Sequence, residues 1–282
     1  MKRITSSQMK YLIFFTLFMV ATAIAETNAV KLPEKKMLKI YLLMGQSNMA
    51  GRGVVEEEDK TPHPRVLVFN RSNQWEVALE PIHLGEPKKT PGVGPSLAFG
   101  KVMAAAKSGI SIGLVPCAVG GTPLHRWERG ADLYANAVAR AKAASEFGTI
   151  AGILWHQGES DAGTKTNAET YSERLTKMIG DIRADLNLPQ LPFVVGQIGE
   201  FNYDREGNPL PFARELNDTL AAFPQKVQFT GCVLSNGLEH KGDQLHFSSK
   251  AERELGKRYA KEILRLEARI KRANSDRKLL QE

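Results

Sequence analysis

Cysteine is scarce in this sequence, and no cluster of metal-binding residues is apparent. The 282 residues include only two cysteines, Cys117 and Cys232, and each lies in an apolar stretch. Two cysteines do not make a disulfide framework, so both are expected to be buried free thiols. The cysteines and histidines also lack the close spacing of a metal site. The fold is therefore expected to depend on neither disulfides nor a bound metal.

Long apolar runs are absent after residue 25, and the run before it has the features of a secretory signal. Lys2, Arg3 and Lys10 precede the apolar residues 11–25, which end in the small-residue cleavage sequence Ala23-Ile24-Ala25. The alternative is an uncleaved anchor, but the run is short for a membrane span of roughly 20 residues. We expect residues 1–25 to be a cleaved signal peptide and the mature protein to be secreted or periplasmic, without membrane association.

Charge is close to balanced once this segment is removed. The net charge is +7, and taking away the three positive charges of Lys2, Arg3 and Lys10 leaves +4. Many of the remaining basic residues lie near the C-terminus: Arg265, Arg269, Lys271, Arg272, Arg277 and Lys278. Such a run is typical of a solvated helix face, so nucleic-acid binding is not expected.

Internal repeats and linkers of biased composition are missing as well. The chain is 42% hydrophobic and 24% charged, which is ordinary for a globular protein. We expect one domain at residues 38–271, preceded by a polar lead-in at 26–37 and followed by a frayed basic tail at 272–282. No feature of the sequence indicates an oligomeric state.

Apolar runs alternate with amphipathic segments along this domain. Five runs are predicted to be strands: residues 38–44, 110–116, 150–156, 193–198 and 227–234. Helices are predicted at residues 96–107, 131–147, 167–186 and 211–223, and from a Ser249–Glu252 capping box onward. Residues 66–69 and 75–79 are expected to form an inserted hairpin. The alternation predicts an α/β fold, a three-layer α/β/α sandwich around a five-stranded parallel sheet.

Residues that suggest chemistry follow four of the predicted strands. Ser47 lies in the turn after the first strand, Gly120-Gly121 follow the second, and Gln157 follows the third. The segment from Asp243 to His246 follows the last strand. Ligands bind beyond the carboxyl ends of the strands in sheets of this kind. The sequence therefore predicts one site that is built from four turns.

A serine nucleophile with its base and orienting acid is the first chemical interpretation. A serine hydroxyl needs a base to take its proton, and the base needs a carboxylate to orient it. His246 has Asp243 three residues before it, a spacing that places both side chains on one side of a turn. The alternatives are a helix-capping role for Asp243 and a core position for His246. Their place after the last strand, together with Ser47, favours the catalytic interpretation.

An ester-cleaving serine also needs donors for the developing oxyanion. The backbone N–H of Ser47 is one candidate, and the Gly120-Gly121 pair permits close approach of a second. The side-chain amide of Gln157 is a third. The alternative for Gly120-Gly121 is an ordinary turn, and for the polar residues around Gln157 it is a cap of the following helix.

Four motifs together resemble the conserved blocks of the SGNH (GDSL-like) hydrolases. They are Gly45-Gln46-Ser47-Asn48-Met49, Gly120-Gly121-Thr122, His156-Gln157-Gly158-Glu159-Ser160-Asp161 and Asp243-Gln244-Leu245-His246. More narrowly, they are similar to the sialate O-acetylesterase and acetylxylan esterase branch, carbohydrate esterase family six. This resemblance implies a flavodoxin-like fold, Ser47 as nucleophile, Asp243 and His246 as its partners and Gly121 as an amide donor. Broader SGNH enzymes have an asparagine where this sequence has Gln157.

The resemblance also implies a reaction. The protein would remove O-acetyl groups from carbohydrate through an acetyl-enzyme, with no cofactor. Possible substrate contacts are Gln46, Arg52, Arg126, Trp127 and Glu159. The alternatives are core packing for the tryptophan and solvated or paired arginines. Two other functions remain open at this point: a non-catalytic carbohydrate-binding protein, and an esterase or thioesterase for other short acyl groups.

Overall fold

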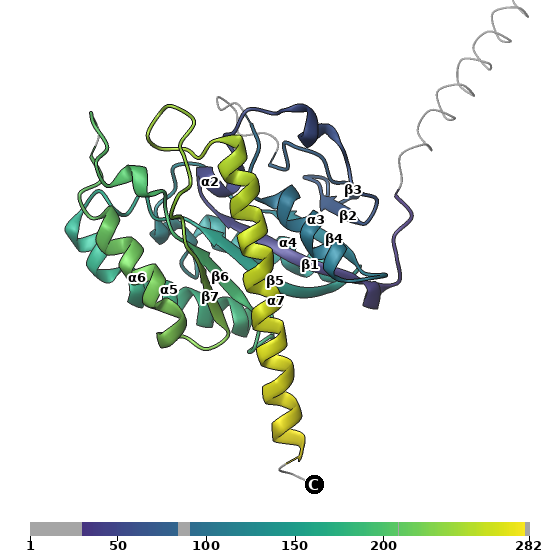
Figure 1. Cartoon of the computed structure of the whole chain (residues 1–282). Helices are drawn as coiled ribbons and strands as arrows, with labels where there is room; N and C mark the ends of the chain where they lie inside the picture. The colour runs from purple at the N-terminus through teal and green to yellow at the C-terminus, as the bar shows by residue number, and fades with distance from the viewer. Residues whose placement is uncertain (1–29, 84–90, 208, 280–282) are drawn as a thin grey trace, which may run out of the picture. The chain divides into compact units, whose positions relative to one another are not determined.

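The structure is a computed structural model that describes residues 30–83, 91–207 and 209–279, the last three without their side chains. The chain divides into two compact units, Met1–Leu32 and Pro33–Glu282, and every described helix and strand belongs to the second (Figure 1). The predicted signal peptide, residues 1–25, lies outside the described residues. No helix in the described part is long and apolar enough to cross a membrane.

The second unit is built on a single sheet of seven strands, in the order β3-β2-β4-β1-β5-β6-β7. The strands are β1 (Leu38–Gly45), β2 (Val66–Phe69), β3 (Trp75–Val77), β4 (Ser111–Pro116), β5 (Thr149–His156), β6 (Phe193–Gly196) and β7 (Thr230–Val233). Every neighbouring pair is parallel except β2 and β3. The predicted parallel α/β sheet is confirmed, and all five predicted strands are present.

The predicted strand number of five is wrong because the hairpin is part of the sheet. β2 pairs in parallel with β4, with Val66 opposite Ile112 and Val68 opposite Leu114. Val66, Leu67 and Phe69 are buried. The hairpin buries these apolar side chains by extending the edge of the sheet, and it does not form a separate insertion.

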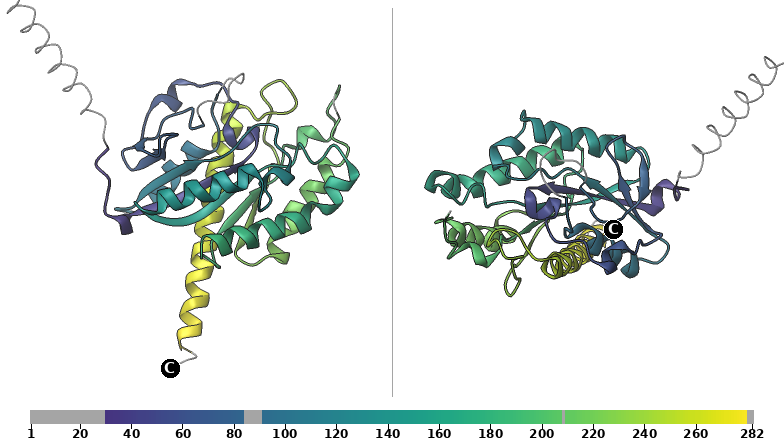
Figure 2. Two further views of the ribbon diagram at one scale, coloured as in Figure 1. Left: turned by 180° about the vertical axis from the view of Figure 1, so that it is seen from behind. Right: turned by 90° about the horizontal axis from the view of Figure 1, so that it is seen from above.

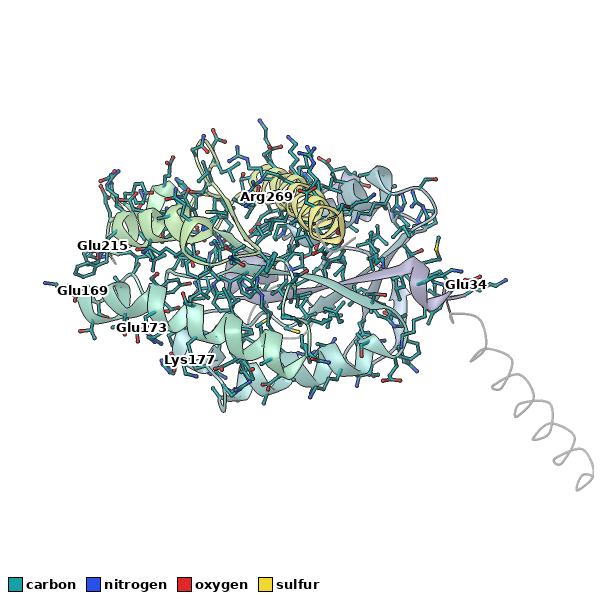
Figure 3. All side chains as sticks on the ribbon, turned by 90° about the horizontal axis from the view of Figure 1, so that it is seen from below. Glu34, Glu169, Glu173, Lys177, Glu215 and Arg269 are labelled. Atoms are coloured by element: carbon teal, nitrogen blue, oxygen red, sulfur yellow. The ribbon has the colours of Figure 1, made fainter. Side chains whose placement is uncertain are left out.

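Helices cover both faces of the sheet and make the predicted three layers. The longer helices are α3 (Ser96–Ala106), α4 (Asp132–Ser145), α5 (Lys165–Asp185), α6 (Ala213–Lys226) and α7 (Ser249–Leu279). α3 and α7 pack together on one face, and α4 and α5 lie on the other (Figures 2 and 3). α6 packs beside α5, on the same face as α4 and α5. The short helix η1 (Lys35–Met37) precedes β1, and four others lie in the connections: α2 (Ser47–Ala50), η2 (Glu57–Lys60), η3 (Leu124–Trp127) and η4 (Glu200–Asn202).

The last helix differs from its predicted form at both ends. Ser248 caps it, since its Oγ accepts a hydrogen bond from the N–H of Ala251 at 3.3 Å. The predicted capping box does not form: Ser249 donates to the carbonyl of Val54 at 2.6 Å, and Glu252 is fully buried. At the other end the helix continues to Leu279, so residues 272–279 are helical where fraying was expected.

The register of the sheet brings the turns of the site together. Gly45, the last residue of β1, pairs with His156, the last residue of β5. Gly45 has a φ of 127°, and a Cβ there would lie 2.1 Å from the carbonyl oxygen of His156. The turn after β4 lies on the other side, where the N–H of Val119 donates to the carbonyl of Gly45 at 3.0 Å. The chain can therefore begin its turn at this point only with a glycine.

Both cysteines are free thiols, as predicted. Cys117 is buried in the turn after β4, and Cys232 is partly buried in β7. Burial raises the pKa of the Cys117 thiol to about 11 and that of Cys232 to about 12. Neither thiol is activated for nucleophilic chemistry.

Candidate active site

The turn after β1 presents Ser47 at the edge of the sheet. Gln46 precedes the single turn of α2, in which Ser47, Asn48, Met49 and Ala50 are all buried. Ser47 keeps 6% of its surface exposed. As the first residue of the turn, Ser47 has a backbone N–H without an acceptor inside the helix. The serine is thus held by a short, buried element and not by a loose loop.

The structure brings Ser47, His246 and Asp243 into one hydrogen-bonded line. His246 Nε2 lies 3.1 Å from Ser47 Oγ, and His246 Nδ1 lies 2.7 Å from Asp243 Oδ2. The other carboxylate oxygen, Asp243 Oδ1, accepts the backbone N–H groups of Leu245 at 3.0 Å and His246 at 2.8 Å. The same carboxylate therefore fixes both the imidazole ring and the backbone that carries it.

A tight turn makes this arrangement possible. Gln244, between the acid and the histidine, has a φ of 52°, in the left-handed region. The turn folds the segment back so that side chains three residues apart meet, as their spacing predicted. His246 is mostly buried, with 17% of its side chain exposed, whereas Asp243 has 38% exposed.

The protonation states of this pair suit a general base. Burial lowers the pKa of His246, and this effect outweighs the opposing influence of Asp243. Burial also opposes ionisation of Asp243, but hydrogen bonds from the backbone and ring of His246 lower the pKa of its carboxyl to about 2. At neutral pH the imidazole is therefore neutral and the carboxylate is ionised.

The turn after β4 carries the predicted glycine donor. Gly121 is exposed and has a φ of 72°, a conformation that favours glycine. Thr122 braces the same turn, because its hydroxyl donates to the carbonyl of Val119 at 2.8 Å and accepts from Trp127 Nε1 at 3.1 Å. The roles of the Ser47 and Gly121 N–H groups as oxyanion donors stay predictions.

Gln157 is placed differently from its predicted role as a third donor. It is fully buried, and its amide donates to Asp161 Oδ2 at 2.6 Å and to the carbonyl of Thr122 at 3.1 Å. The hydroxyl of Tyr171 donates to its oxygen at 2.8 Å. The two amide hydrogens are thus taken up by acceptors inside the protein. The buried Asp161 carboxylate needs this donor, so Gln157 links the β4 and β5 turns.

Three of the five residues predicted to contact the substrate are Arg52, Arg126 and Trp127. Trp127 is fully buried and packs edge to face against Trp155, with ring centroids 5.3 Å apart, so its predicted substrate contact is wrong. Arg126 forms an exposed ion pair with Asp132. Arg52 is partly exposed and donates to the carbonyl of Gly51 at 2.7 Å, close enough to His246 to lower the pKa of the imidazole.

Gln46 and Glu159, the other two predicted contacts, lie below the surface. Gln46 is 2% exposed and Glu159 is 4% exposed. Gln46 Oε1 accepts from Gln157 Nε2 at 3.3 Å. Burial raises the pKa of Glu159 to about 7. Neither side chain is exposed enough to form a binding surface for a sugar.

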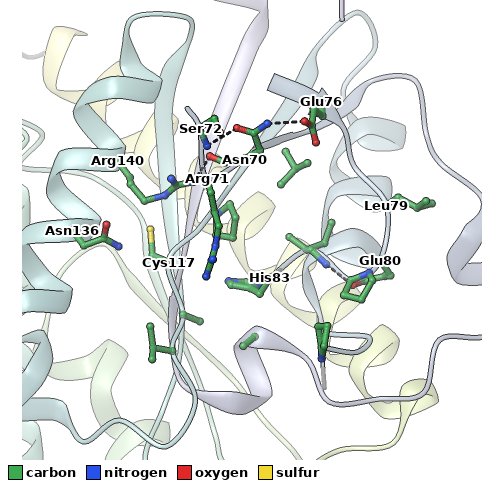
Figure 4. A pocket seen from close by; sticks show the side chains of 18 of the residues that line it. Asn70, Arg71, Ser72, Glu76, Leu79, Glu80, His83, Cys117, Asn136 and Arg140 are labelled. Carbon is green, nitrogen blue, oxygen red and sulfur yellow. Dashed lines mark hydrogen bonds between the residues drawn. The ribbon is translucent and has the colours of Figure 1, made fainter. Parts of the chain in front are cut away.

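A cavity beside the Ser47 turn was not expected from the sequence. Its volume is about 680 Å³, and its lining includes Ala50 and Arg52 just after the serine and Ala118 and Val119 just before the glycines. Polar side chains also line it from the β2–β3 hairpin and from α4: Asn70, Arg71, Glu76, Asn136 and Arg140. Arg71 extends across the cavity between Cys117 and His83 (Figure 4). The polar residues at the tip of the β2–β3 hairpin are the one feature of the sequence that could have pointed to this cavity. From the sequence they indicated only a turn.

Among the described residues, no group of three histidine, cysteine, aspartate or glutamate side chains is arranged to hold a metal ion. The Ser47–His246–Asp243 line is the arrangement of nucleophile, base and orienting acid that acyl transfer requires.

Comparison with known proteins gives consistent matches. Residues 37–265 match the family described as carbohydrate esterase, sialic acid-specific acetylesterase. A probable carbohydrate esterase of Arabidopsis thaliana is 36% identical over 236 residues, which cover 77% of this chain and 87% of the relative. The X-ray structure of that Arabidopsis protein covers 82% of this chain and 98% of its own, with a TM-score of 0.73 and 33% identity. The crystal structure of NanS covers 84% of this chain and 100% of its own, with a TM-score of 0.68; at 18% identity this likeness concerns the fold.

Proposed function

Because the chain belongs to the carbohydrate esterase family of sialic acid-specific acetylesterases, we propose that it removes O-acetyl groups from carbohydrate through an acetyl-enzyme on Ser47. Carbohydrate esterase activity follows from the family itself. The nucleophile, the steps of the reaction and export of the protein are the parts that we propose. The observation that carries them is the hydrogen-bonded line from Ser47 Oγ through His246 to Asp243.

The first half of the reaction forms the acetyl-enzyme. His246 Nε2 takes the proton of Ser47 Oγ as the oxygen attacks the acetyl carbonyl carbon. The tetrahedral intermediate then breaks its bond to the sugar oxygen, which leaves with the proton held by the imidazolium. Asp243 remains ionised throughout, because its carboxyl has a pKa of about 2, and its charge stabilises the imidazolium.

The second half of the reaction uses the same base on water. His246 takes a proton from a water molecule that attacks the acetyl carbon, and Ser47 Oγ leaves with that proton. Acetate is released, and the enzyme returns to its starting state. In both halves the negative oxygen is met by the N–H groups of Ser47 and Gly121, which lie on different turns.

The cavity beside the Ser47 turn is our candidate for the sugar compartment. It reaches Ala50 and Arg52 on one turn and Ala118 and Val119 on another, so a bound sugar would present its ester toward the serine. Asn136 is exposed at its wall and offers an amide for sugar hydroxyls. The polar side chains on its wall can bind sugar hydroxyls, which a long acyl chain does not offer.

The nucleophile is tested with aryl acetate and the Ser47→Ala variant. We expect the variant to lose at least about 10³-fold in kcat, since it lacks the attacking oxygen. Ser145→Ala is the matched control, because Ser145 lies on α4 and its hydroxyl donates only to the carbonyl of Lys142 in the same helix. A Ser47→Ala enzyme as active as the Ser145→Ala enzyme would remove Ser47 from the mechanism.

The carbohydrate is identified by comparing acetylated xylan, O-acetylated sialic acid and aryl acetate as substrates. The sialate substrate is the one suggested by the family description. We expect kcat/KM for at least one acetylated sugar to exceed that for aryl acetate, because only the sugar fills the cavity. Equal values across the panel would argue against the cavity as a sugar compartment.

Export is proposed from the basic start and apolar run of residues 1–25. The test is expression of the full chain, followed by fractionation and N-terminal sequencing of the product. We expect the mature protein outside the cytoplasm, beginning at Glu26. Recovery of a cytoplasmic product with residues 1–25 intact would contradict export.

A further inference from the structure

Asn48, directly after Ser47, is joined to the segment that carries His246. Its side chain is fully buried, and it belongs to the short helix α2. Asn48 Nδ2 donates to the carbonyl of Leu245 at 3.2 Å, and Asn48 Oδ1 accepts from the N–H of Phe247 at 3.2 Å. Leu245 and Phe247 are the two neighbours of His246. A single amide therefore joins the residue beside the nucleophile to the residues on both sides of the base.

The geometry of these contacts is that of a strand pairing. In an extended chain, the carbonyl of one residue and the N–H of the second residue after it point to the same side. The Asn48 amide pairs with both groups at once, as a neighbouring strand would. The opposite side of the segment is already paired with the backbone: the N–H of Lys241 donates to His246 at 2.9 Å, and the N–H of Ser248 donates to Glu239 at 2.9 Å. The His246 segment is thus held from two sides.

Glu159 fixes the orientation of the Asn48 amide. Its Oε1 accepts the remaining hydrogen bond of Asn48 Nδ2, at 2.5 Å. Glu159 is 4% exposed, and its second oxygen has no hydrogen-bond partner among the residues that the structure describes. An acceptor in this position disfavours a flipped amide, which would bring the oxygen of Asn48 against Glu159 and against the carbonyl of Leu245.

We propose that Asn48 and Glu159 are positioning residues that set the hydrogen bond between Ser47 and His246. Asn48 holds the base at a fixed distance from the nucleophile turn, and Glu159 holds Asn48. The proposal rests on the proposed role of Ser47 as nucleophile. A displacement of about 1 Å between reacting groups is enough to cost on the order of 10²-fold in rate, so the loss of this clamp should appear in kcat.

The test compares four variants in two assays. Asn48→Ala removes the clamp, and Asn48→Asp keeps its shape but places a carboxylate oxygen against two acceptors. Glu159→Ala removes the acceptor, whereas Glu159→Gln retains one. The first assay is aryl acetate hydrolysis, with kcat and KM determined separately. The second is the rate of inactivation by phenylmethanesulfonyl fluoride, which reports the reactivity of Ser47 without requiring sugar binding.

We expect Asn48→Ala, Asn48→Asp and Glu159→Ala to lower kcat and the inactivation rate at least about tenfold, with KM within about threefold of wild type. Glu159→Gln should stay within about threefold in both assays, because an amide oxygen still accepts from Asn48. Loss of activity in Glu159→Ala but not in Glu159→Gln would show that Asn48 needs a hydrogen-bond acceptor at position 159 and not a negative charge.

Asn217→Ala is the control for loss of stability alone. Asn217 is equally buried and also pairs with a backbone N–H and carbonyl, both of Ile198, at 2.9 and 2.8 Å. We expect it to lower the melting temperature as Asn48→Ala does while the inactivation rate stays within about threefold of wild type. If Asn48→Ala does not fold, the pair of Glu159 variants decides the question.

Three outcomes would overturn the proposal or a part of it. A folded Asn48→Ala enzyme that reacts with the sulfonyl fluoride at the wild-type rate would overturn the inference alone. Equal losses in Glu159→Gln and Glu159→Ala would do the same for Glu159. Full activity of Ser47→Ala would instead overturn the proposed nucleophile, and this inference with it.

Discussion

At the scale of single residues, the site depends on opposite effects of the protein on two titratable groups. Burial favours the neutral form of His246, and hydrogen bonds favour the ionised form of Asp243. A neutral imidazole beside a carboxylate is ready to accept a proton without prior deprotonation. Ser47 needs no unusual property of its own, because its reactivity comes from this pair.

This arrangement predicts the pH dependence of the reaction. The pKa of His246 is lowered, so the neutral base becomes more abundant as the pH rises through values below 6.5. We expect kcat/KM for aryl acetate to rise about tenfold per pH unit on this limb and to level off above it. The measurement is the rate profile from pH 4 to pH 8. A profile that is flat over this range would contradict His246 as the base.

The Asp243→Asn variant provides the control for this profile. The carboxylate of Asp243 raises the pKa of the imidazole, so its removal should move the rising limb to lower pH. The plateau should fall by at least about 10²-fold, because the ring loses its orienting acceptor. An unchanged plateau would mean that Asp243 has only a structural role.

At the scale of elements, the site depends on where neighbouring strands of the sheet end. The carboxyl ends of β1, β4 and β5 are adjacent in the sheet, so their turns meet without any long loop. Gly45 marks the point where β1 stops, and its position against the carbonyl of His156 leaves no room for a side chain. The direction of the Ser47 turn therefore depends on contact between two strands.

A pair of glycine substitutions tests this requirement. Gly45→Ala would place a Cβ 2.1 Å from a backbone oxygen at a φ of 127°, and we expect it to lower the free energy of unfolding by at least about 3 kcal/mol. Gly180→Ala is the control, because nothing lies within 4 Å of its Cβ and it sits inside α5. It should increase stability by about 0.5–1 kcal/mol.

Urea unfolding of the two variants, followed by circular dichroism, provides the comparison. Equal stability of Gly45→Ala and wild type would show that the strand end can relax around a methyl group. In that case the close packing at Gly45 would not be what directs the turn.

At the scale of the whole described unit, α7 has two different halves. Ala251, Leu255, Tyr259, Ile263 and Leu266 are buried in its first part. Residues 271–276 are exposed, and the end of the helix extends beyond the sheet (Figure 1). The part up to Leu266 completes the core against α3, while the part after Leu266 contributes no buried side chain among those described.

Truncation separates these halves. Removing residues 272–282 should change the free energy of unfolding by less than about 0.5 kcal/mol, because the described side chains in this range are exposed. Ending the chain after Glu262 removes Ile263 and Leu266, which are 0% and 2% exposed, and should cost at least about 3 kcal/mol. Thermal unfolding measures both. A large loss from the shorter deletion would show that the basic end of α7 stabilises the fold.

The sequence by itself determined the parts of this protein that depend on local chemistry. Apolar runs predicted five strands of the sheet, and the Asp243–His246 spacing predicted a contact that a single turn creates. The glycine at position 121 likewise suits its local backbone angle. These features follow from neighbouring residues, so their pattern is visible along the chain.

Only the tertiary structure decided which side chains face the site and which face the core. Trp127 and Gln157 stand beside the motifs in sequence, yet both are enclosed by partners far along the chain. The pairing of β2 with β4 enlarged the sheet, and the cavity formed where the hairpin meets α4. Asn48 acquired its contacts with Leu245 and Phe247 across nearly 200 residues. Burial and long-range pairing depend on how all the elements pack together, and no local pattern of residues records that packing.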